Sequence, residues 1–437
     1  MNYIYGKKII INESKNIFSK LSLTEEGKII IEKYEKNIKV SKDLLNIPSK
    51  VLTFSGFAYE KEILIAYICN NNKLIVSRLD DKLLEDLISI NININSNRFN
   101  TLCLKVQDGI IHIFYNYCNL INSDVWTIKH IVCHKGIKKH NIISYIPLKD
   151  NPTFTVDLDS LGNIHLVYEN KEEQLHQLYY LQFSSLLGKW RKYPKDISDK
   201  HNSPLNYYIF IDSKDILHVI WNLKYNNTVI YYKILSNNTN NRYNWVDISL
   251  PQNNDNKIHP IFFQHQNHLK IIYIDNNKKI KGFFSKDFGL SWNIYDFQSS
   301  EKYNDLVPIA FASKDSTSNT HINHIYYSDN NIVLPTIYAL NNNNSKIETN
   351  SLNMDDHHQE STSTKNNKDI LDAIKQFEES KKDIIKSIDD IKNNLDENHE
   401  ILIKKMESIN DNIINLKNNL DNKSQKGFIN KIINLFK

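Results

Sequence analysis

The sequence lacks several features that would assign it to a class at once. No apolar run approaches the roughly 18 to 20 residues that a spanning helix needs. Residues 1–12 have neither the apolar segment nor the cleavage site of a signal peptide. The 437 residues include only four cysteines and no Cys-x-x-Cys pair, so neither a disulfide scaffold nor a zinc ribbon is expected. We therefore expect a protein without a transmembrane helix that is cytoplasmic, or deployed at a surface by a non-classical route.

Signatures of common catalytic and phosphate-binding sites are missing too. The ten glycines form no Gly-rich phosphate loop, and neither a nucleophile elbow nor a His-Glu-x-x-His helix occurs. We therefore expect no cofactor and no metal. The net charge of +4 results from 54 basic and 50 acidic residues, and no part of the chain is basic enough to require nucleic acid as a partner.

What the sequence does contain is a strand-like segment that recurs at a fixed spacing. Its three clearest copies, at 110–116, 164–170 and 216–222, are rich in β-branched and aromatic residues, and their histidines fall 53 residues apart both times. Weaker copies occur at 63–70, 268–275 and 322–329. Short strands with a period of roughly 40 to 50 residues are typical of propellers and arrays.

Four strand-like runs can be assigned to most repeats, which predicts one antiparallel sheet per repeat. Radial repetition of such sheets leaves few exposed edges. We therefore predict an all-β propeller over residues 1–340. If the N-terminal run fills a missing outer place in the last repeat, the ring has six blades; if residues 1–47 form their own blade, it has seven.

One segment carries a family resemblance. Ser285-Lys-Asp287-Phe-Gly289-Leu-Ser291-Trp292 agrees with the Asp-box pattern at every defined position, and so resembles the bacterial neuraminidase (BNR) repeats of sialidase-like propellers. In a tight hairpin the Asp287 carboxylate can accept backbone N–H groups, Gly289 can adopt a positive φ and Trp292 can anchor the loop. The resemblance implies a structural role for these residues.

The same resemblance implies a sialidase site, which the composition argues against. Sialidases hold the substrate carboxylate with three arginines, one of them in a Phe/Tyr-Arg-Ile-Pro segment, and lysine is a poor replacement for that planar fork. The chain has four arginines in all, none followed by Ile-Pro. We expect no sialidase activity, while hydrolysis by another pair of carboxylates on the same scaffold stays open.

Candidate binding residues are few. Glu169 lies within a predicted strand and is the first acid to consider, and Trp126 and Trp221 are the candidates for an aromatic sugar-binding surface. The repeated histidines could suggest a metal site, but equivalent residues of successive blades lie roughly 10 Å apart, too far to share an ion. We expect their imidazoles to bridge to backbone or to a tyrosine instead.

The last quarter of the chain changes character. Residues 341–367 are polar and predict a flexible linker. Apolar residues then recur at alternating steps of three and four, which predicts a coiled coil over 368–423. Through 370–420 we expect a homo-oligomer, a trimer before a dimer; the alternative is a helix that folds back on its own chain. Residues 424–437 predict a basic amphipathic helix whose segment 427–437 contacts a membrane surface or a partner protein.

These patterns favour a non-catalytic binding or adhesion module. Its propeller head would recognise a carbohydrate or a protein, and the coiled coil would multiply that affinity. Two alternatives stay open: a glycoside-acting enzyme with an unrecognised carboxylate pair, and an intracellular scaffold or assembly protein tethered through its C-terminal helix.

Overall fold

The structure is a computed structural model, and it describes residues 7–14, 17–35, 38–60, 62–80, 82–147, 152–172, 175–199, 204–223, 226–237, 243–251, 257–296, 306–313 and 320–327. The chain divides into one unit, Met1–Lys346, and another, Ile347–Lys437, and all the described residues belong to the first. The predicted linker, coiled coil and terminal helix therefore lie outside the described residues. Within the described part of the chain, no helix is long and apolar enough to cross a membrane.

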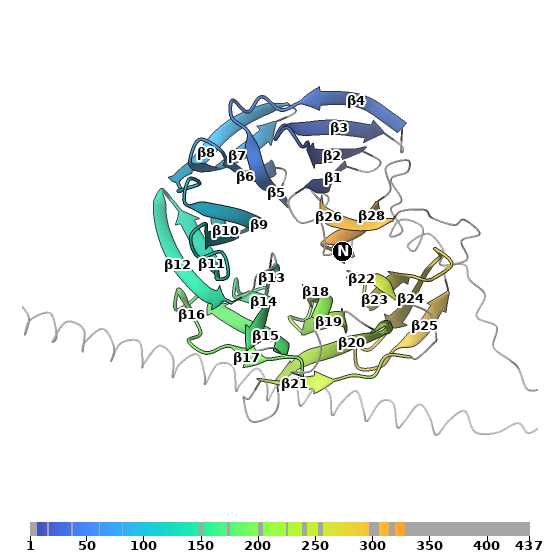
Figure 1. The fold of residues 1–437 in the computed structure, drawn as a ribbon. Helices are drawn as coiled ribbons and strands as arrows, with labels where there is room; N and C mark the ends of the chain where they lie inside the picture. The colour runs from blue at the N-terminus through green and yellow to red at the C-terminus, as the bar shows by residue number, and fades with distance from the viewer. Residues whose placement is uncertain are drawn as a thin grey trace, which may run out of the picture. The chain divides into compact units, whose positions relative to one another are not determined.

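The described strands form six sheets set radially around one centre (Figure 1). This arrangement confirms the predicted all-β propeller and the first of the two blade counts, six. The six sheets are numbered as blades 1 to 6 in chain order. Each blade has a run of consecutive strands, and the first strand of that run lies nearest the centre.

The strands of the first three blades are long and regular. Blade 1 contains β1 (Lys8–Ser14), β2 (Ile17–Leu23), β3 (Ile29–Glu35) and β4 (Ile38–Leu44). Blade 2 contains β5 (Val51–Tyr59), β6 (Glu62–Cys69), β7 (Lys73–Asp80) and β8 (Leu83–Asn91). Blade 3 contains β9 (Asn97–Gln107), β10 (Ile110–Asn119), β11 (Trp126–His134) and β12 (Ile137–Ile146).

The outer strands of the other three blades are shorter. Blade 4 contains β13 (Phe154–Leu158), β14 (Ile164–Glu172), β15 (Leu175–Ser184), β16 (Lys189–Trp190) and β17 (Lys195–Asp196). Blade 5 contains β18 (Pro204–Ile211), β19 (Leu217–Leu223), β20 (Asn226–Asn237) and β21 (Tyr243–Asp247). Blade 6 contains β22 (Ile258–His265), β23 (His268–Ile274), β24 (Ile280–Ser285) and β25 (Asn293–Asp296).

The last strands close the ring rather than form a seventh blade. β26 (Val307–Ser313) pairs with β1 in parallel, Ile10 opposite Phe311, and β28 (His324–Tyr327) pairs with β26. β27 (Thr320–Ile322) joins β22 of blade 6. The N-terminal run was predicted to fill an outer place in the last blade, and this detail was wrong. The N-terminal segment supplies four strands of its own, and the C-terminal strands β26 and β28 join them on the inner side.

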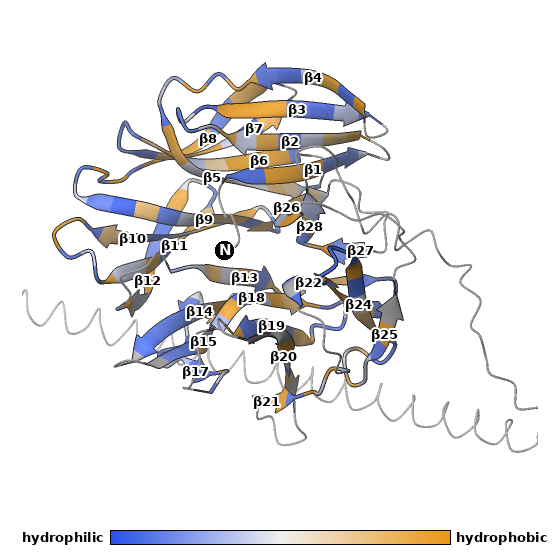
Figure 2. Ribbon diagram, turned by 45° about the vertical axis from the view of Figure 1, so that its right-hand side comes forward, coloured by the Kyte–Doolittle hydropathy of each residue, from blue (hydrophilic) through white to orange (hydrophobic). Residues whose placement is uncertain are grey.

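The apolar core lies between neighbouring blades. On β6 the side chains of Ile63, Ile65 and Tyr67 pack toward blade 1, whereas those of Leu64 and Ala66 pack toward blade 3. Successive residues of a strand point to opposite faces, so a strand buried on both faces needs an unbroken apolar run. Figure 2 shows a short run of this kind in the first half of β3, residues 29–31, before the polar residues that follow.

Candidate functional site

The two tryptophans predicted to bind a ligand are buried. Trp126 of β11 is fully buried between blades 3 and 4, and the Arg98 guanidinium lies 5.0 Å from its ring centroid. Trp221 of β19 packs between blades 4 and 5 and stacks on Tyr231, with ring centroids 5.5 Å apart and an interplanar angle of 15°. Neither indole is presented to solvent, whereas 36% of Tyr231 is exposed.

Glu169 faces the same seam as Trp221. It follows Val167 of β14 by two residues, and Val167 packs in the apolar cluster that contains Trp221. Glu169 Oε1 lies 2.5 Å from Nδ1 of His176, and both side chains remain partly exposed. The seam between blades 4 and 5 therefore combines a partly exposed carboxylate and imidazole on blade 4 with a tyrosine ring on blade 5 that stacks on Trp221.

Residues 285–292 form a loop between β24 and β25 that bonds to itself. Asp287 Oδ1 accepts from Ser285 Oγ at 2.7 Å and from the Ser291 amide at 2.9 Å. Trp292 Nε1 donates to the Gly289 carbonyl at 3.1 Å, and Gly289 has a φ of +89°. These bonds close the hairpin from within, so the acid's acceptor positions are used by the loop itself.

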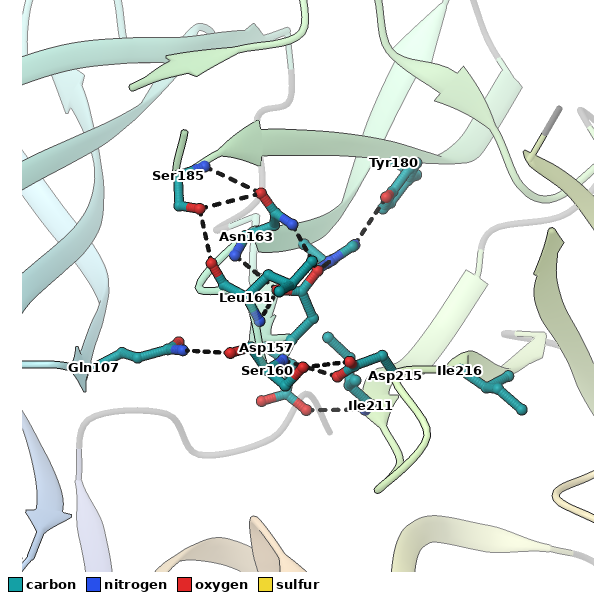
Figure 3. A network of polar contacts seen from close by, with 12 residues as sticks. Gln107, Asp157, Ser160, Leu161, Asn163, Tyr180, Ser185, Ile211, Asp215 and Ile216 are labelled. Carbon is teal, nitrogen blue, oxygen red and sulfur yellow. Dashed lines mark hydrogen bonds and ion pairs between the residues drawn. The ribbon is translucent and has the colours of Figure 1, made fainter. Parts of the chain in front are cut away.

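Sequence reasoning missed a chain of contacts from aspartate through histidine to tyrosine that occurs in two blades. In blade 4, Asp159 Oδ2 lies 3.2 Å from His165 Nε2, and His165 Nδ1 lies 2.8 Å from the Tyr180 hydroxyl (Figure 3). In blade 5, His218 lies at the same two distances from Asp212 and Tyr232, the acid once more six residues before the histidine. The equal spacing of aspartate and histidine in the two repeats was the sequence signal that could have revealed these contacts.

These Asp–His–Tyr chains stabilise the turns at the start of the second strand. Asp212 Oδ1 accepts from the amides of Lys214 and Ile216 at 2.8 and 2.9 Å, so the acid closes its turn while it orients the imidazole. Burial lowers the pKa of His218, although its bond to Asp212 opposes that effect. With the side chains of both residues fully buried, the group has no access to a substrate and acts in packing.

The tryptophans near the fourth strands join one blade to the blade before it. Trp190 of blade 4 donates from Nε1 to His130 Nδ1 of blade 3 at 3.1 Å. Trp245 of blade 5 lies edge-on to Tyr180 of blade 4 at 5.4 Å. In the same way Trp292 of blade 6 meets Tyr232 of blade 5 at 5.3 Å. A tryptophan at this place in the repeat is therefore an inter-blade contact.

A buried ion pair lies where the inner strands meet. Lys105 Nζ of β9 lies 3.1 Å from Asp157 Oδ1 of β13, with side-chain exposures of 11% and 4%. Asp157 Oδ2 also accepts from the Ile211 amide of β18 at 3.0 Å and faces Asn323 Nδ2 at 3.5 Å. Burial alone would lower the pKa of Lys105, but the Asp157 carboxylate raises it above its usual value. Blades 3, 4 and 5 thus share one carboxylate.

The turns between first and second strands form a hydrogen-bonded belt on one face. The bonds run from Gly109 N to the Tyr59 hydroxyl (3.1 Å), from Gln107 Nε2 to the Ser160 carbonyl (3.3 Å), from Ser160 N to Asp215 Oδ1 (2.8 Å) and from Ser213 N to Gln264 Oε1 (2.8 Å). Figure 3 shows the middle of this turn belt, around Ser160. Blades 2 to 6 are therefore cross-linked on this face, which we call the turn face.

Metal ligands do not gather anywhere in the described segments. Among them no group of three or more His, Cys, Asp or Glu side chains could hold a metal ion. The buried histidines of blades 4 and 5 each contact one aspartate and one tyrosine, and His112 of blade 3 contacts His130.

The buried histidine pair of blade 3 predicts acid sensitivity. His112 Nδ1 lies 3.1 Å from His130 Nε2, and burial lowers the pKa of His112 from 6.5 to about 4. Below about pH 6.5 the His112 imidazole binds a proton in the unfolded chain, whereas in the folded chain it stays neutral down to about pH 4. The free energy of unfolding therefore decreases as pH falls from about 6.5 to about 4. At pH 5 we expect a loss of about 2 kcal/mol from His112.

Urea unfolding at two pH values would measure this loss. His112→Gln keeps a donor toward His130 and does not titrate, so its free energy of unfolding should fall less than that of the wild type between neutral pH and pH 5. His134→Gln, at the exposed end of β11, the strand that contains His130, is the control and should retain the wild-type pH dependence. Equal pH dependence in wild type and His112→Gln would contradict the prediction.

Comparison with known proteins identifies no family for this chain. The sequence matches no protein-family model and no curated protein. Among solved structures, an ulvan lyase from a polysaccharide lyase family is 13% identical, with a TM-score of 0.48, covering 75% of this chain and 96% of its own. The six-bladed lectin of Aleuria aurantia is 11% identical (TM-score 0.38; 67% and 95% covered), and the α-L-arabinanase of Penicillium chrysogenum 8% (TM-score 0.40; 63% and 93% covered). The class of fold follows from the six sheets of the chain itself, which form a six-bladed β-propeller.

Proposed function

We propose that the propeller is a non-catalytic binding head that recognises a carbohydrate or protein ligand, with a carbohydrate at the seam between blades 4 and 5 as the first candidate. The proposal rests on one observation above all: the buried carboxylates of the described residues serve structure. Hydrolysis of a glycosidic bond needs two carboxyl groups roughly 5 to 10 Å apart on either side of an accessible bond. Acids that close turns and join blades are not free for that role. They include Asp157, Asp159, Asp212, Asp275 and Asp287.

The positions of the described arginines also favour binding over sialidase chemistry. Arg78 of blade 2 pairs with Glu62 at 2.8 Å and also with Glu85. Arg98 of blade 3 lies over Trp126, and Arg191 follows the outer strand of blade 4. Three arginines in three blades, one of them already paired with two acids, do not suit the joint recognition of one carboxylate. The 285–292 loop supports kinship with Asp-box propellers, and this kinship is compatible with a binding role.

The seam offers the contacts that a sugar requires. Tyr231 presents part of its ring to solvent while Trp221 supports it from the other side, and the apolar face of a pyranose can stack on such a ring. The Glu169 carboxylate and the His176 imidazole, both partly exposed, could bond the hydroxyl groups. The predicted coiled coil at 370–420 would hold several propellers in one oligomer, and this multivalency would strengthen weak binding at each single site.

A glycan array with the full chain tests the proposal. Tyr231→Ala should weaken binding to the recognised glycan by about tenfold, since one stacking contact contributes about 0.5 to 1.5 kcal/mol beyond buried area. Tyr193→Ala is the matched control, because Tyr193 is 71% exposed and contacts Lys192 rather than an indole. Equal losses in both variants, or no glycan bound by the wild type, would contradict the carbohydrate assignment. Hydrolysis of an aryl glycoside that disappears in Glu169→Gln would contradict the non-catalytic assignment.

A further inference from the structure

The outer hairpins of the propeller share an exposed aliphatic side chain. β4, β8 and β12 each begin with one: Ile38 is 70% exposed, Leu83 76% and Ile137 73%. The corresponding turns of blades 4 and 6 hold Leu186 (92%), Leu187 (69%) and Leu290 (62%). We call these six residues the aliphatic rim. It is present in each third-to-fourth hairpin that the structure describes, since residues 238–242 of blade 5 lie outside the described residues.

The aliphatic rim lies on the turn face. Each blade runs from its inner strand to its outer strand in antiparallel steps, so its first and third turns open on the same side. Two bonds agree with this placement: Ser185 Oγ donates to the Leu161 carbonyl at 2.8 Å, and Lys139 Nζ donates to the Gly188 carbonyl at 2.7 Å. The first joins the two turn types within blade 4, and the second joins the outer hairpins of blades 3 and 4. Figure 1 shows the outer strands spread around the circumference.

The opposite face has a different composition. Its described second-to-third turns include residues 70–72, which are three asparagines, and 275–279, Asp-Asn-Asn-Lys-Lys. Of the second-to-third turns that the structure describes, the one between β10 and β11 carries exposed aliphatic side chains, Leu120 (55%) and Ile121 (97%). Exposed aliphatic tips recur from blade to blade on the turn face, and this repetition argues that they serve contact with something outside the propeller.

Basic residues accompany part of the rim. Lys138 follows Ile137, whereas Lys39 beside Ile38 pairs with Glu32, and Lys82 beside Leu83 pairs with Asp43. The charge is strongest in blades 3 and 4, where residues 125–147 and 175–195 hold eight lysines and arginines and no aspartate or glutamate. Since Lys139 bonds to residue 188, these two basic stretches adjoin. The partner of this surface should therefore carry negative charge.

We propose that the aliphatic rim docks the propeller onto a membrane surface that contains anionic lipids. The spacing of the apolar tips favours a bilayer over a protein partner. One or two side chains per blade, spread around a ring, give no contiguous apolar core of the kind that a stable protein interface needs. Separate side chains can each enter the boundary between headgroups and acyl chains, while nearby lysines attract the anionic headgroups. This inference is independent of the proposed ligand site and of the C-terminal segment.

Vesicle sedimentation with the full chain tests the proposal. Phosphatidylcholine vesicles that contain phosphatidylserine should bind the wild type more strongly than vesicles of phosphatidylcholine alone. Leu186→Ser/Leu187→Ser should weaken that binding by about tenfold or more, because two exposed apolar side chains are lost from the contact. Leu120→Ser/Ile121→Ser is the matched control: it makes the same change in an adjacent exposed pair on the opposite face, and should bind as the wild type does.

Hydrogen exchange with vesicles present locates the contact directly. Exchange should slow at 134–139 and 184–190, and not at 119–123. The proposal is overturned if the wild type does not prefer phosphatidylserine vesicles, if Leu186→Ser/Leu187→Ser binds as tightly as the wild type, or if both double variants lose binding equally. It is also overturned if the wild type forms a dimer that binds no vesicles and Leu186→Ser/Leu187→Ser abolishes that dimer. The rim would then be an interface between two copies of the chain.

Discussion

Replacement of Asp157 by alanine is expected to lower the free energy of unfolding by about 3 to 5 kcal/mol. The substitution leaves the Lys105 ammonium buried near the centre without its counter-charge, and the Ile211 amide without its acceptor. Each loss is expensive because neither group can regain water in the folded state. Urea unfolding followed by tryptophan fluorescence should show the midpoint moved to much lower urea with little change in slope.

Two further variants separate the charge effect from simple loss of packing. Lys105→Met/Asp157→Leu removes both charges, so it should cost less than Asp157→Ala alone. Glu85→Ala breaks the contact between Arg78 and Glu85, whose side chains are 40% and 63% exposed, and should cost less than about 1 kcal/mol. If Asp157→Ala is as mild as Glu85→Ala, the contacts of Asp157 with Lys105 and the Ile211 amide do not stabilise the inner strands.

The sequence predicted the blades because their pattern is local. A strand such as β6, buried on both faces, is a run of apolar residues that stands out from the polar turns on either side, and the run returns with each repeat. The period of 53 residues between His112, His165 and His218 needs no knowledge of contacts. A structural bond from His165 to backbone or to a tyrosine was expected, since an imidazole repeated in successive blades suits such a bond better than a shared metal; the contact with Asp159 was not expected.

The closure and the site depend on contacts between distant residues, which leave no local trace. The pairing of Ile10 with Phe311 joins the two ends of the propeller, and a parallel pair of short strands has no sequence signature of its own. Lys105 and Asp157 are 52 residues apart, in separate repeats. Trp126 and Trp221 were chosen for their ring chemistry, but exposure is a tertiary property, and the exposed ring of the seam is that of Tyr231. With 24 tyrosines in the chain, residue type alone could not single it out.

Replacement of Gly289 by alanine should be the most damaging small change in the 285–292 loop. A Cβ atom at this position would lie 2.0 Å from the Tyr232 hydroxyl and 3.3 Å from His218 Cε1. The hydroxyl cannot move freely, because it lies 2.8 Å from His218 Nδ1 within the Asp–His–Tyr chain of blade 5. The positive φ of +89° adds a second penalty for any residue with a Cβ. We expect the free energy of unfolding to fall by about 2 to 4 kcal/mol.

Gly136→Ala distinguishes the collision from the backbone penalty. Gly136 also has a positive φ, +81°, but nothing lies within 4 Å of its ideal Cβ position. This variant should therefore lose only about 1 kcal/mol, the backbone penalty alone. The difference in urea midpoint between the two variants measures the contact of the loop with Tyr232, and hence the seam between blades 5 and 6. Equal midpoints would mean that the loop does not press against Tyr232, and that the Asp–His–Tyr chain of blade 5 is held without it.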